Sequence, residues 1–394
     1  MNILFLLKTH NVGGIERVSH FLANYFFDKG HKVVFVSFET PPDSVRRALN
    51  SDIPIYILQY PVCSKQNINR LHLILAKCDI DFIINQWGLP YTFAKLSYKA
   101  SRGLSIKRIS VYHSCPHSNG KITLVDRMIR ESNFLIKQKI LSIVKYFVTC
   151  ITSQSMKYSF LNSDAYIVLS EHYRLELLEF IGLGKRYLSK IYAISNPLTL
   201  TMNQCLQKKE KEIIYVGRLS QEKAVFRLID SWNLLEHKFP DWRLTIVGDG
   251  PQSDFLKKKV DILKLERVSF EGFQNPEKYY RRASVLCLTS EYEGFGLVVV
   301  EGMSWGVVPI VYGSYAAIYD IINSGTDGYI LQPDDKGGFD TVMMKEYMEK
   351  LMTSNGLLKS MSEKAVEKSK QFSIDSIYSQ WLQLFHELDN KIKV

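Results

Sequence analysis

Short hydrophobic runs alternate with longer amphipathic stretches along most of the chain. The run "NILFLL" at residues 2–7 is followed by a polar, glycine-containing loop, and a second run, "HKVVFVSF", begins at His31. Between them lies a stretch whose apolar residues recur at helical spacing: Val18, Phe21, Leu22, Tyr25 and Phe26. Gly30 is a suitable helix stop. This order predicts a strand, a helix and a parallel strand.

The same rhythm continues on both sides of a polar, proline-containing break at residues 195–212. Five more candidate strands precede the break, at "IPIYIL", "DFIINQ", "RISVYH", "AYIVLS" and "IYAIS". Six follow it, at "IIYVG", "WRLTIVGDG", "RVSFEGF", "SVLCLTS", "VVPIVYG" and "GYILQP". We therefore predict two doubly wound, parallel-sheet domains at 1–196 and 212–372, a linker at 197–211 and an amphipathic C-terminal helix at 373–394.

Residues 120–160 depart from this rhythm, because they form one long stretch of helical period that is rich in aromatic residues. From Arg127 to Lys157 the stretch holds six basic residues and one acidic residue, Glu131. One interpretation is a core helix with a solvated basic face. The other is a surface that rests on anionic lipid.

Composition limits the class of protein. A chain of 394 residues exceeds one ordinary core, and 46% hydrophobic with 23% charged residues is typical of a globular protein. The six cysteines are scattered without ligand-like spacing, which favours reduced thiols and argues against a structural zinc site. The apolar run at the start is too short for a signal peptide, and no run of eighteen apolar residues predicts a transmembrane helix.

The net charge of +10 is unevenly distributed. Residues 1–196 hold 25 Lys and Arg against 13 Asp and Glu, a net +12, whereas the remainder holds 25 against 27, a net −2. A basic half predicts an anionic partner such as nucleic acid, an anionic membrane surface or a phosphorylated lipid.

The loop "GRLSQEKA" after the first strand of the second half carries two cations. Gly217 makes the turn, Ser220 is a candidate helix cap, and Lys223 is expected in the first turn of that helix, with Arg218 close by. A cation in a first turn opposes the helix dipole. Two solvated surface cations are one interpretation, and the unfavourable position of Lys223 favours the other, a diphosphate clamp.

Two further glycine turns follow strands. Gly248 in "TIVGDGPQ" stands where a nucleotide crosses the carboxyl ends of a parallel sheet, and Gly14 in "HNVGG" would let a phosphate or sugar approach the backbone. The chain lacks the full G-x-G-x-x-G fingerprint, which argues against a nicotinamide or flavin enzyme. The D-x-D pair Asp79 and Asp81 directly precedes a strand, so we interpret it as a polar lead-in rather than a metal site.

The stretch "EYEGFGLVVVEGMSWG" at residues 291–306 places Glu293 and Glu301 eight positions apart. Its "LVVV" favours a strand by local propensity, yet a helix beginning near Gly296 would put Leu297 and Glu301 on one face. In that geometry a phosphate meets free helix amides, and the two carboxylates accept hydrogen bonds from sugar hydroxyls on either side. We predict the helix.

These motifs, in this order and spacing, resemble the retaining GT-B glycosyltransferases of family 4. The motifs are "GGIERV", "GRLSQEKA", "VGDGP", "FEGF" and "SEYEGFGLVVVEGMSWGVVPIV". The resemblance spans nearly the whole chain and is strongest from 211 to 333. It implies an α/β GT-B architecture, with two Rossmann-like domains whose parallel sheets face across a cleft. It also implies that the C-terminal helix crosses back to the N-terminal, acceptor-binding domain.

The resemblance also implies roles for particular residues. Arg218 and Lys223 would neutralise the donor diphosphate, Glu301 would accept from the ribose hydroxyls, and Glu293 would hold the donor sugar. His113, in "SVYHSCP", would reach the reacting sugar. The remaining implied donor-binding residues are Gly14, Gly248, Phe273, Gly294, Phe295, Gly296 and Leu297. No metal or other cofactor is expected, because cations and helix amides would stabilise the leaving diphosphate.

Three positions depart from the family pattern. Trp305 stands where a small residue is usual, Gly302 replaces an alanine, and Asp320 in "GSYAAIYDII" takes the acidic place of a Gly-Gly-x-x-Glu motif. These departures affect the expected donor-sugar pocket and leave the diphosphate site intact.

We therefore expect a cytoplasmic enzyme, peripheral on the inner face of the cell membrane. It would transfer a sugar from a nucleotide sugar, which we expect to be UDP-linked, to a lipid-linked or growing cell-surface glycan. Three alternatives stay open at this point: a transferase that uses a soluble acceptor, a GT-B nucleotide-sugar epimerase, and an inactive scaffold. Nucleic-acid binding explains the charge but none of the motifs.

Overall fold

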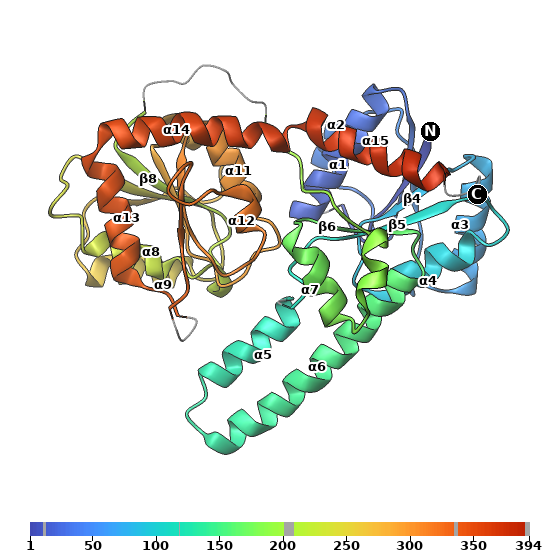
Figure 1. Ribbon diagram of the computed structural model, residues 1–394, viewed down its shortest axis with the longest axis horizontal. Coiled ribbons are helices and arrows are strands. Elements are labelled where there is room, and N and C mark those ends of the chain that lie inside the picture. The colour runs from blue at the N-terminus through green and yellow to red at the C-terminus, as the bar shows by residue number, and fades with distance from the viewer. Residues whose placement is uncertain (11–12, 118, 201–208, 335–337, 391–394) are drawn as a thin grey trace. The chain divides into compact units, whose positions relative to one another are not determined.

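The computed structural model describes residues 1–10, 13–117, 119–200, 209–334 and 338–390. The chain divides into two compact units, one formed by 1–199 with 374–394 and the other by 200–373 (Figure 1). Most of the predicted linker, at 201–208, and the last four residues of the predicted C-terminal helix lie outside the described residues.

The N-terminal unit is built on a seven-stranded sheet in the order β3-β2-β1-β4-β5-β6-β7, in which every neighbouring pair is parallel. Its strands match the runs predicted for the first half. They are β1 (Asn2–Leu6), β2 (Lys32–Ser37), β3 (Ile55–Ile57), β4 (Phe82–Asn85), β5 (Lys107–Tyr112), β6 (Ala165–Val168) and β7 (Ile191–Ala193).

The helices of this unit connect successive strands. They are α1 (Gly14–Asp28), α2 (Asp43–Ala48), α3 (Lys65–Lys77), α4 (Tyr91–Ala100), α5 (Gly120–Arg130), α6 (Leu135–Leu161), α7 (His172–Phe180) and the 3₁₀ helix η1 (Lys185–Lys190). The C-terminal α15 (Ile374–Asn390) packs on α1, where Phe26 contacts the rings of Trp381 and Phe385, and the Tyr25 hydroxyl donates to Asp375.

The C-terminal unit holds a six-stranded parallel sheet in the order β10-β9-β8-β11-β12-β13. Its strands are β8 (Glu212–Val216), β9 (Arg243–Val247), β10 (Val268–Phe270), β11 (Val285–Leu288), β12 (Val308–Tyr312) and β13 (Tyr329–Leu331). Its helices are η2 (Gln221–Lys223), α8 (Phe226–Asn233), α9 (Ser253–Ile262), α10 (Glu277–Arg282), α11 (Leu297–Ser304), α12 (Ile318–Ile321), α13 (Thr341–Thr353), α14 (Asn355–Ser369) and η3 (Lys370–Phe372).

Both sheets are buried on both faces, as the continuous apolar runs require. The residues of β4, β6 and β11 are all buried, and so are those of β12. From β8 the strands run towards β10 in one direction along the sheet, and from β11 they run towards β13 in the other. Because crossovers between parallel strands are right-handed as a rule, helices cover both faces. The predicted α/β class with two Rossmann-like, parallel-sheet domains is confirmed.

Candidate donor site

Three of the glycine loops meet at the carboxyl edge of the C-terminal sheet. The Gly217 amide donates to the Val247 carbonyl (3.0 Å), and the Gly248 amide donates to the Gly272 carbonyl (2.8 Å). The φ angle of Gly248 is +145°, and a Cβ there would collide with the carbonyl oxygen of Gly217. Glycine is therefore required at 248 for the loops after β8 and β9 to lie against each other.

The two loops on either side of the switch in strand order are joined by an ion pair. The order of the sheet reverses between β8 and β11, and a ligand of a doubly wound sheet binds outside the strands at such a point. Here Lys223 Nζ, from the loop after β8, lies 2.5 Å from Glu293 Oε1, from the loop after β11. Ser290 Oγ also donates to Glu293 Oε1, at 2.8 Å. Both side chains keep some exposure, 21% for Lys223 and 13% for Glu293.

Backbone and side-chain bonds hold these two loops together beneath the ion pair. The Glu291 amide donates to the Glu222 carbonyl (2.7 Å), and the Thr289 hydroxyl donates to the Ala224 carbonyl (3.0 Å). Arg227 adds an ion pair to Glu291 at 3.3 Å. The position of Lys223 relative to Glu293 is thus fixed by the loops as well as by the charges.

The helix predicted after Ser220 is only a single 3₁₀ turn, and Lys223 lies in that turn. Lys223 is the last residue of the 3₁₀ helix η2, and α8 begins only at Phe226 after Ala224 in a left-handed conformation. Ser220 uses its hydroxyl to donate to Glu222 Oε1 (2.5 Å). The unfavourable helix dipole therefore does not explain Lys223, whereas its pairing with Glu293 does.

The prediction of a helix after the Gly-Phe-Gly turn is confirmed. Helix α11 runs from Leu297 to Ser304, and its N-cap Gly296 has φ +87°, a conformation that favours glycine. A Cβ at Gly296 would collide with the Tyr315 hydroxyl. Phe295 is buried, and its ring contacts that of Phe372. Gly294 to Leu297 therefore form a fixed turn next to Glu293.

Glu301 lies in different surroundings from Glu293. Its side chain is 1% exposed, and the Tyr280 hydroxyl donates to its Oε2 at 3.3 Å. Tyr280 comes from α10, so α10 closes over the first turns of α11 at this point. The ribose role of Glu301 stays a prediction, and it requires a ligand to reach an acid that Tyr280 already contacts.

Arg218 and Phe273 are the exposed members of the predicted donor set. Arg218 is exposed, and its carbonyl accepts from the Tyr215 hydroxyl (3.0 Å) below it. Burial, and then the charges of Glu293 and Glu222, raise the pKa of Tyr215 well above its usual value, so Tyr215 stays a neutral donor. Phe273 is 79% exposed after β10. A large apolar ring held in solvent is suited to stack on a flat ligand group.

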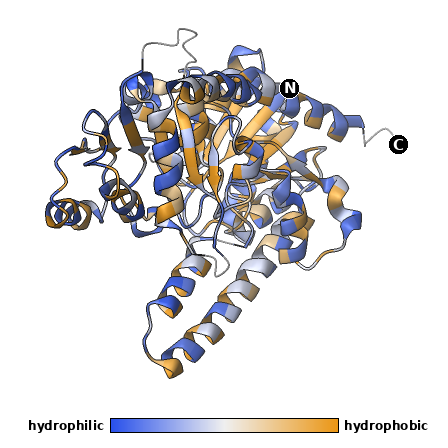
Figure 2. Ribbon diagram, turned by 60° about the vertical axis from the view of Figure 1, so that its left-hand side comes forward, coloured by the Kyte–Doolittle hydropathy of each residue, from blue (hydrophilic) through white to orange (hydrophobic). Residues whose placement is uncertain are grey.

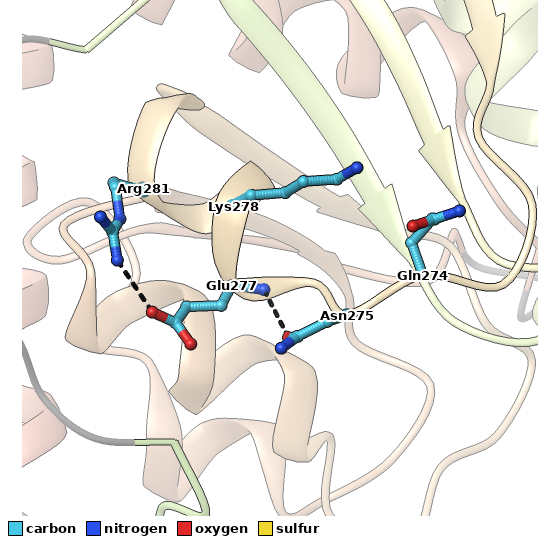
Figure 3. A pocket seen from close by; sticks show the side chains of 5 residues that line it. All are labelled: Gln274, Asn275, Glu277, Lys278 and Arg281. Carbon is cyan, nitrogen blue, oxygen red and sulfur yellow. Dashed lines mark hydrogen bonds and ion pairs between the residues drawn. The ribbon is translucent and has the colours of Figure 1, made fainter.

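The residues that directly follow Phe273 in the chain line a cavity of about 410 Å³. Its lining residues are Gln274, Asn275, Glu277, Lys278 and Arg281. Figure 3 shows Arg281 paired with Glu277 (2.9 Å) and Lys278 extending away from that pair. The guanidinium of Arg281 lies over the ring of Trp305, 5.3 Å from its centroid. Trp305 is buried, so the large residue at 305 packs against Arg281, one of the residues that line this cavity.

In the N-terminal unit, His113 follows β5 and bonds to a neighbouring loop. Its Nε2 lies 2.6 Å from Gln86 Oε1, and a carbonyl oxygen only accepts, so Nε2 carries the proton. Burial lowers the pKa of His113 to about 4, although the Asn196 side chain opposes this shift. At neutral pH His113 is therefore uncharged and acts as a hydrogen-bonding group rather than as a cation.

Gly14 is the first residue of α1 and is exposed. A Cβ at Gly14 would meet nothing within 4 Å, whereas one at Gly13 would collide with the Glu16 carboxylate. The contact at 13 involves only the end of a flexible side chain, and the backbone at 14 faces open space. Such space is what close approach of a ligand to the backbone needs.

Several neighbours of the predicted site residues were not predicted from the sequence. They are Gln86 beside His113, Ser290 beside Glu293, Tyr280 beside Glu301, and the Arg227–Glu291 pair. Gln86 and Ser290 each follow a strand of their sheet, at the edge where such sites form. Position after a strand was therefore a usable signal for these two. Tyr280 and Arg227 lie on helices and carried no such signal.

Asp79 and Asp81 are located at the amino end of β4. The Asp81 carboxylate accepts from the Asn2 amide at 2.7 Å. Within the described ranges, no group of three or more His, Cys, Asp or Glu side chains is arranged to hold a metal ion. Independence of metal stays a prediction.

Each half of the chain matches the model of a known protein family. Residues 12–201 match the model described as Glycosyltransferase Family 4, and residues 202–368 match that described as Glycosyl transferases group 1. The chain is therefore a glycosyltransferase of the group 1/family 4-like type with the GT-B fold.

Individual relatives agree with this class. An uncharacterized glycosyltransferase of Haemophilus influenzae is 27% identical over 96% of this chain and 97% of its own. The Campylobacter jejuni GalNAc-alpha-(1->4)-GalNAc-alpha-(1->3)-diNAcBac-PP-undecaprenol alpha-1,4-N-acetyl-D-galactosaminyltransferase is 26% identical over 52% of this chain and 57% of its own. The structure of Anabaena HepE in complex with UDP aligns with a TM-score of 0.74 at 16% identity, covering 98% of this chain and 100% of that one. At this identity HepE supports the fold alone.

Proposed function

We propose that this glycosyltransferase moves a sugar from a UDP-linked donor to a lipid-linked or growing cell-surface glycan, with retention of anomeric configuration and without a metal ion. The observation that carries the proposal is the Lys223–Glu293 pair at the switch point between β8 and β11. It puts a cation and a carboxylate at the edge where this type of sheet binds nucleotides.

The proposed chemistry is electrostatic. Negative charge develops on the diphosphate as the bond to the sugar breaks, and Lys223 with the exposed Arg218 would stabilise that charge. The fixed turn from Gly294 to Leu297 offers amides at the N-terminus of α11. Retention would follow a same-face path in which the leaving phosphate helps to deprotonate the acceptor.

Glu293 would change partners when the donor binds. In the structure its Oε1 takes bonds from both Lys223 and Ser290. A diphosphate draws Lys223 towards itself, and Glu293 then becomes available to accept from hydroxyls of the donor sugar while Ser290 holds it in place. Neutral His113 holds its Nε2 proton on Gln86, so its proposed contact with the sugar would be made by Nδ1 accepting from a hydroxyl.

The names of the relatives support the choice of substrates. HepE was captured with UDP, and the Campylobacter jejuni enzyme is named for an acceptor carried on PP-undecaprenol. The basic N-terminal half of this chain, at +12, fits an acceptor at an anionic membrane surface. The proposed membrane attachment is peripheral, through this basic half. None of the helices in the described segments is long and apolar enough to cross a bilayer.

The site assignment is tested by Lys223→Ala and Glu301→Ala, followed by donor consumption and sugar transfer. Each variant is expected to lose about 10²–10³-fold in turnover, the effect of removing one preorganised charge partner. Lys211→Ala is the control, because Lys211 also forms an ion pair but with the exposed Asp241. Undiminished turnover in both site variants would contradict the assignment.

A panel of nucleotide sugars, scored by the rise in melting temperature, identifies the donor. The proposal expects a UDP-linked sugar to give the largest rise. Conversion of that donor without any acceptor would instead indicate an epimerase, and full turnover on a water-soluble acceptor would indicate the soluble-acceptor alternative.

A further inference from the structure

Helices α5 and α6 form a hairpin (Figure 1). The tip of this hairpin is strongly apolar and exposed. Phe134, Leu135 and Ile136, at the turn into α6, are 73%, 75% and 77% exposed. Three consecutive apolar residues at the start of a helix point in different directions around its axis. A single flat partner along one face would not cover all three, whereas a medium surrounding the tip would.

An exposed apolar stripe continues from the tip along α6. Its residues are spaced by four, three, four and four positions and so lie on one face of the helix: Ile136, Ile140, Ile143, Phe147 and Ile151. All are more than half exposed. Lys145 lies on the opposite face and reaches Asp126 of α5 at 2.5 Å. The stripe therefore faces away from α5. Figure 2 shows hydrophobic positions alternating with hydrophilic ones along the hairpin.

A continuous apolar surface that is exposed in the folded chain indicates a partner. Three occupants are possible in principle: a lipid surface, a second copy of this chain, or another protein. The charges of the hairpin decide among them.

The hairpin is strongly basic. Residues 120–161 hold seven Lys and Arg against Asp126 and Glu131, a net +5, and α6 itself holds four lysines and no acid. At 100° per residue, Lys137 and Lys139 fall on opposite sides of the stripe. Their long side chains can keep the ammonium groups at a phosphate layer while the stripe and the tip enter the apolar layer.

A second copy fits this charge pattern poorly. Where helices pair through stripes spaced by three and four residues, flanking charges of opposite sign set the choice of partner, and α6 offers lysines alone. Two +5 hairpins would repel each other. An anionic bilayer supplies both the apolar layer and the negative charge that the hairpin lacks.

We propose that the α5–α6 hairpin is the element that docks this protein on an anionic lipid bilayer, with the tip residues Phe134, Leu135 and Ile136 inserted and the α6 stripe lying in the interface. The proposal deepens the proposed function, on which it rests for a membrane-borne acceptor. Of the two interpretations of residues 120–160, the proposal adopts the lipid-facing surface. The docking itself is measured without donor or acceptor, so it stands or falls separately from catalysis.

The test is co-sedimentation of the full chain with vesicles of phosphatidylcholine, with and without phosphatidylglycerol, at physiological salt. Wild type is expected to bind the anionic vesicles at least tenfold more tightly than the neutral ones. The triple variant Phe134→Ser, Leu135→Ser, Ile136→Ser is expected to lose at least tenfold of that affinity. Lys137→Gln and Lys139→Gln should each lose about fivefold, the contribution of one cation near a charged surface.

Matched controls separate docking from folding and from general stickiness. Ile262→Ser removes an equally exposed apolar residue, at 78%, from α9 of the other unit and should leave vesicle binding unchanged. The tip variant should keep its melting temperature and its response to UDP. Unchanged vesicle binding in the tip variant would overturn the proposal. So would a wild-type dimer in sedimentation velocity that Ile143→Glu dissociates, because it would assign the stripe to a second copy.

Discussion

Lys223 and Glu293 neutralise each other's charge, so a substitution of either residue also affects the stability of the fold. Each is partly buried, and each is the nearest opposite charge to the other at 2.5 Å. Without Lys223, the Glu293 carboxylate keeps Ser290 as its described partner in these two loops. A hydrogen bond to a charged group contributes about 1.5–3 kcal/mol to stability, so the lost bond to Lys223 also lowers the free energy of unfolding. Loss of turnover in Lys223→Ala should therefore be reported together with the free energy of unfolding.

At the residue scale, Gly14 offers a test of ligand approach that leaves the fold intact. A methyl group at 14 meets no atom within 4 Å, so Gly14→Ala should change the free energy of unfolding by less than about 1 kcal/mol. If a donor phosphate or sugar packs against this backbone, the same methyl should lower turnover by tenfold or more. The measurements are donor turnover and urea unfolding.

Gly356→Ala is the matched control for this prediction. Gly356 lies in the first turn of α14, and a Cβ there also meets nothing within 4 Å. It should leave turnover at the wild-type level. Wild-type turnover in Gly14→Ala as well would show that no ligand comes close to residue 14.

Arg218, Lys223 and Gly248 were identifiable from the sequence pattern, because they follow strands in short, glycine-containing loops. Phe273, Phe295 and the role of His113 came instead from the resemblance to a known family. The residues that contact these site residues were harder to predict from the sequence. Ser290 and Gln86 could have been found by the same rule, whereas Tyr280 reaches Glu301 from a helix 21 positions earlier. Such a contact depends on how α10 packs on α11, which no local pattern encodes.

At the scale of a single element, α11 contains two glycines with opposite requirements. Gly302 lies inside the helix, where a Cβ would come 3.1 Å from a methyl group of Leu286, a flexible side-chain end. Replacing a mid-helix glycine by alanine gains about 0.8–1.0 kcal/mol in helix propensity. Gly302→Ala should therefore be neutral or stabilise the protein by up to about 1 kcal/mol.

Gly296→Ala should do the reverse. Gly296 has φ +87°, and a Cβ there collides with the Tyr315 hydroxyl, so we expect a loss of about 1–3 kcal/mol. Chemical unfolding of both variants, followed by tryptophan fluorescence, measures the contrast. Equal effects of the two substitutions would contradict the conformations assigned to this helix and its cap.

In two elements, local secondary-structure propensity favours a different structure from the one that forms. "LVVV" favours a strand locally, yet it forms α11 because the Gly296 cap and burial against the sheet outweigh the preference of its β-branched residues. The loop around Lys223 shows the opposite error, since the capping serine and the following residues suggested an α-helix. Ser220 instead bonds to Glu222, and only a 3₁₀ turn forms.

At the scale of the whole molecule, three histidines of the N-terminal unit make its stability depend on pH. Burial lowers the pKa of His10, His20 and His113 to about 4, with His10 adding a repulsive charge for His20. The unfolded chain titrates its histidines near pH 6.5. Between these values the unfolded state binds more protons, so the free energy of unfolding is fully present above pH 6.5 and falls as the pH drops towards 4.

We expect His113→Gln to reduce this acid sensitivity. Glutamine keeps a donor for Gln86 and removes the titrating ring, so the drop in unfolding free energy between pH 7.5 and 5.0 should be smaller than in wild type by roughly 1 kcal/mol or more. Urea unfolding at both pH values is the measurement. His237→Gln, at an exposed position of the other unit, is the control, and an equal drop in all three proteins would contradict the prediction.

The sequence by itself determined the alternation of strands and helices, the two parallel-sheet units, the glycine loops at the carboxyl edge and the basic character of residues 120–160. These follow from local periodicity, from the backbone freedom of glycine and from counted charge. Only the tertiary structure decided that Lys223 pairs with Glu293, that Tyr280 covers Glu301, that Trp305 supports Arg281, and that the apolar stripe of α6 faces away from α5. Each of these depends on which surfaces meet when distant segments pack, because side chains acquire partners only in the folded chain.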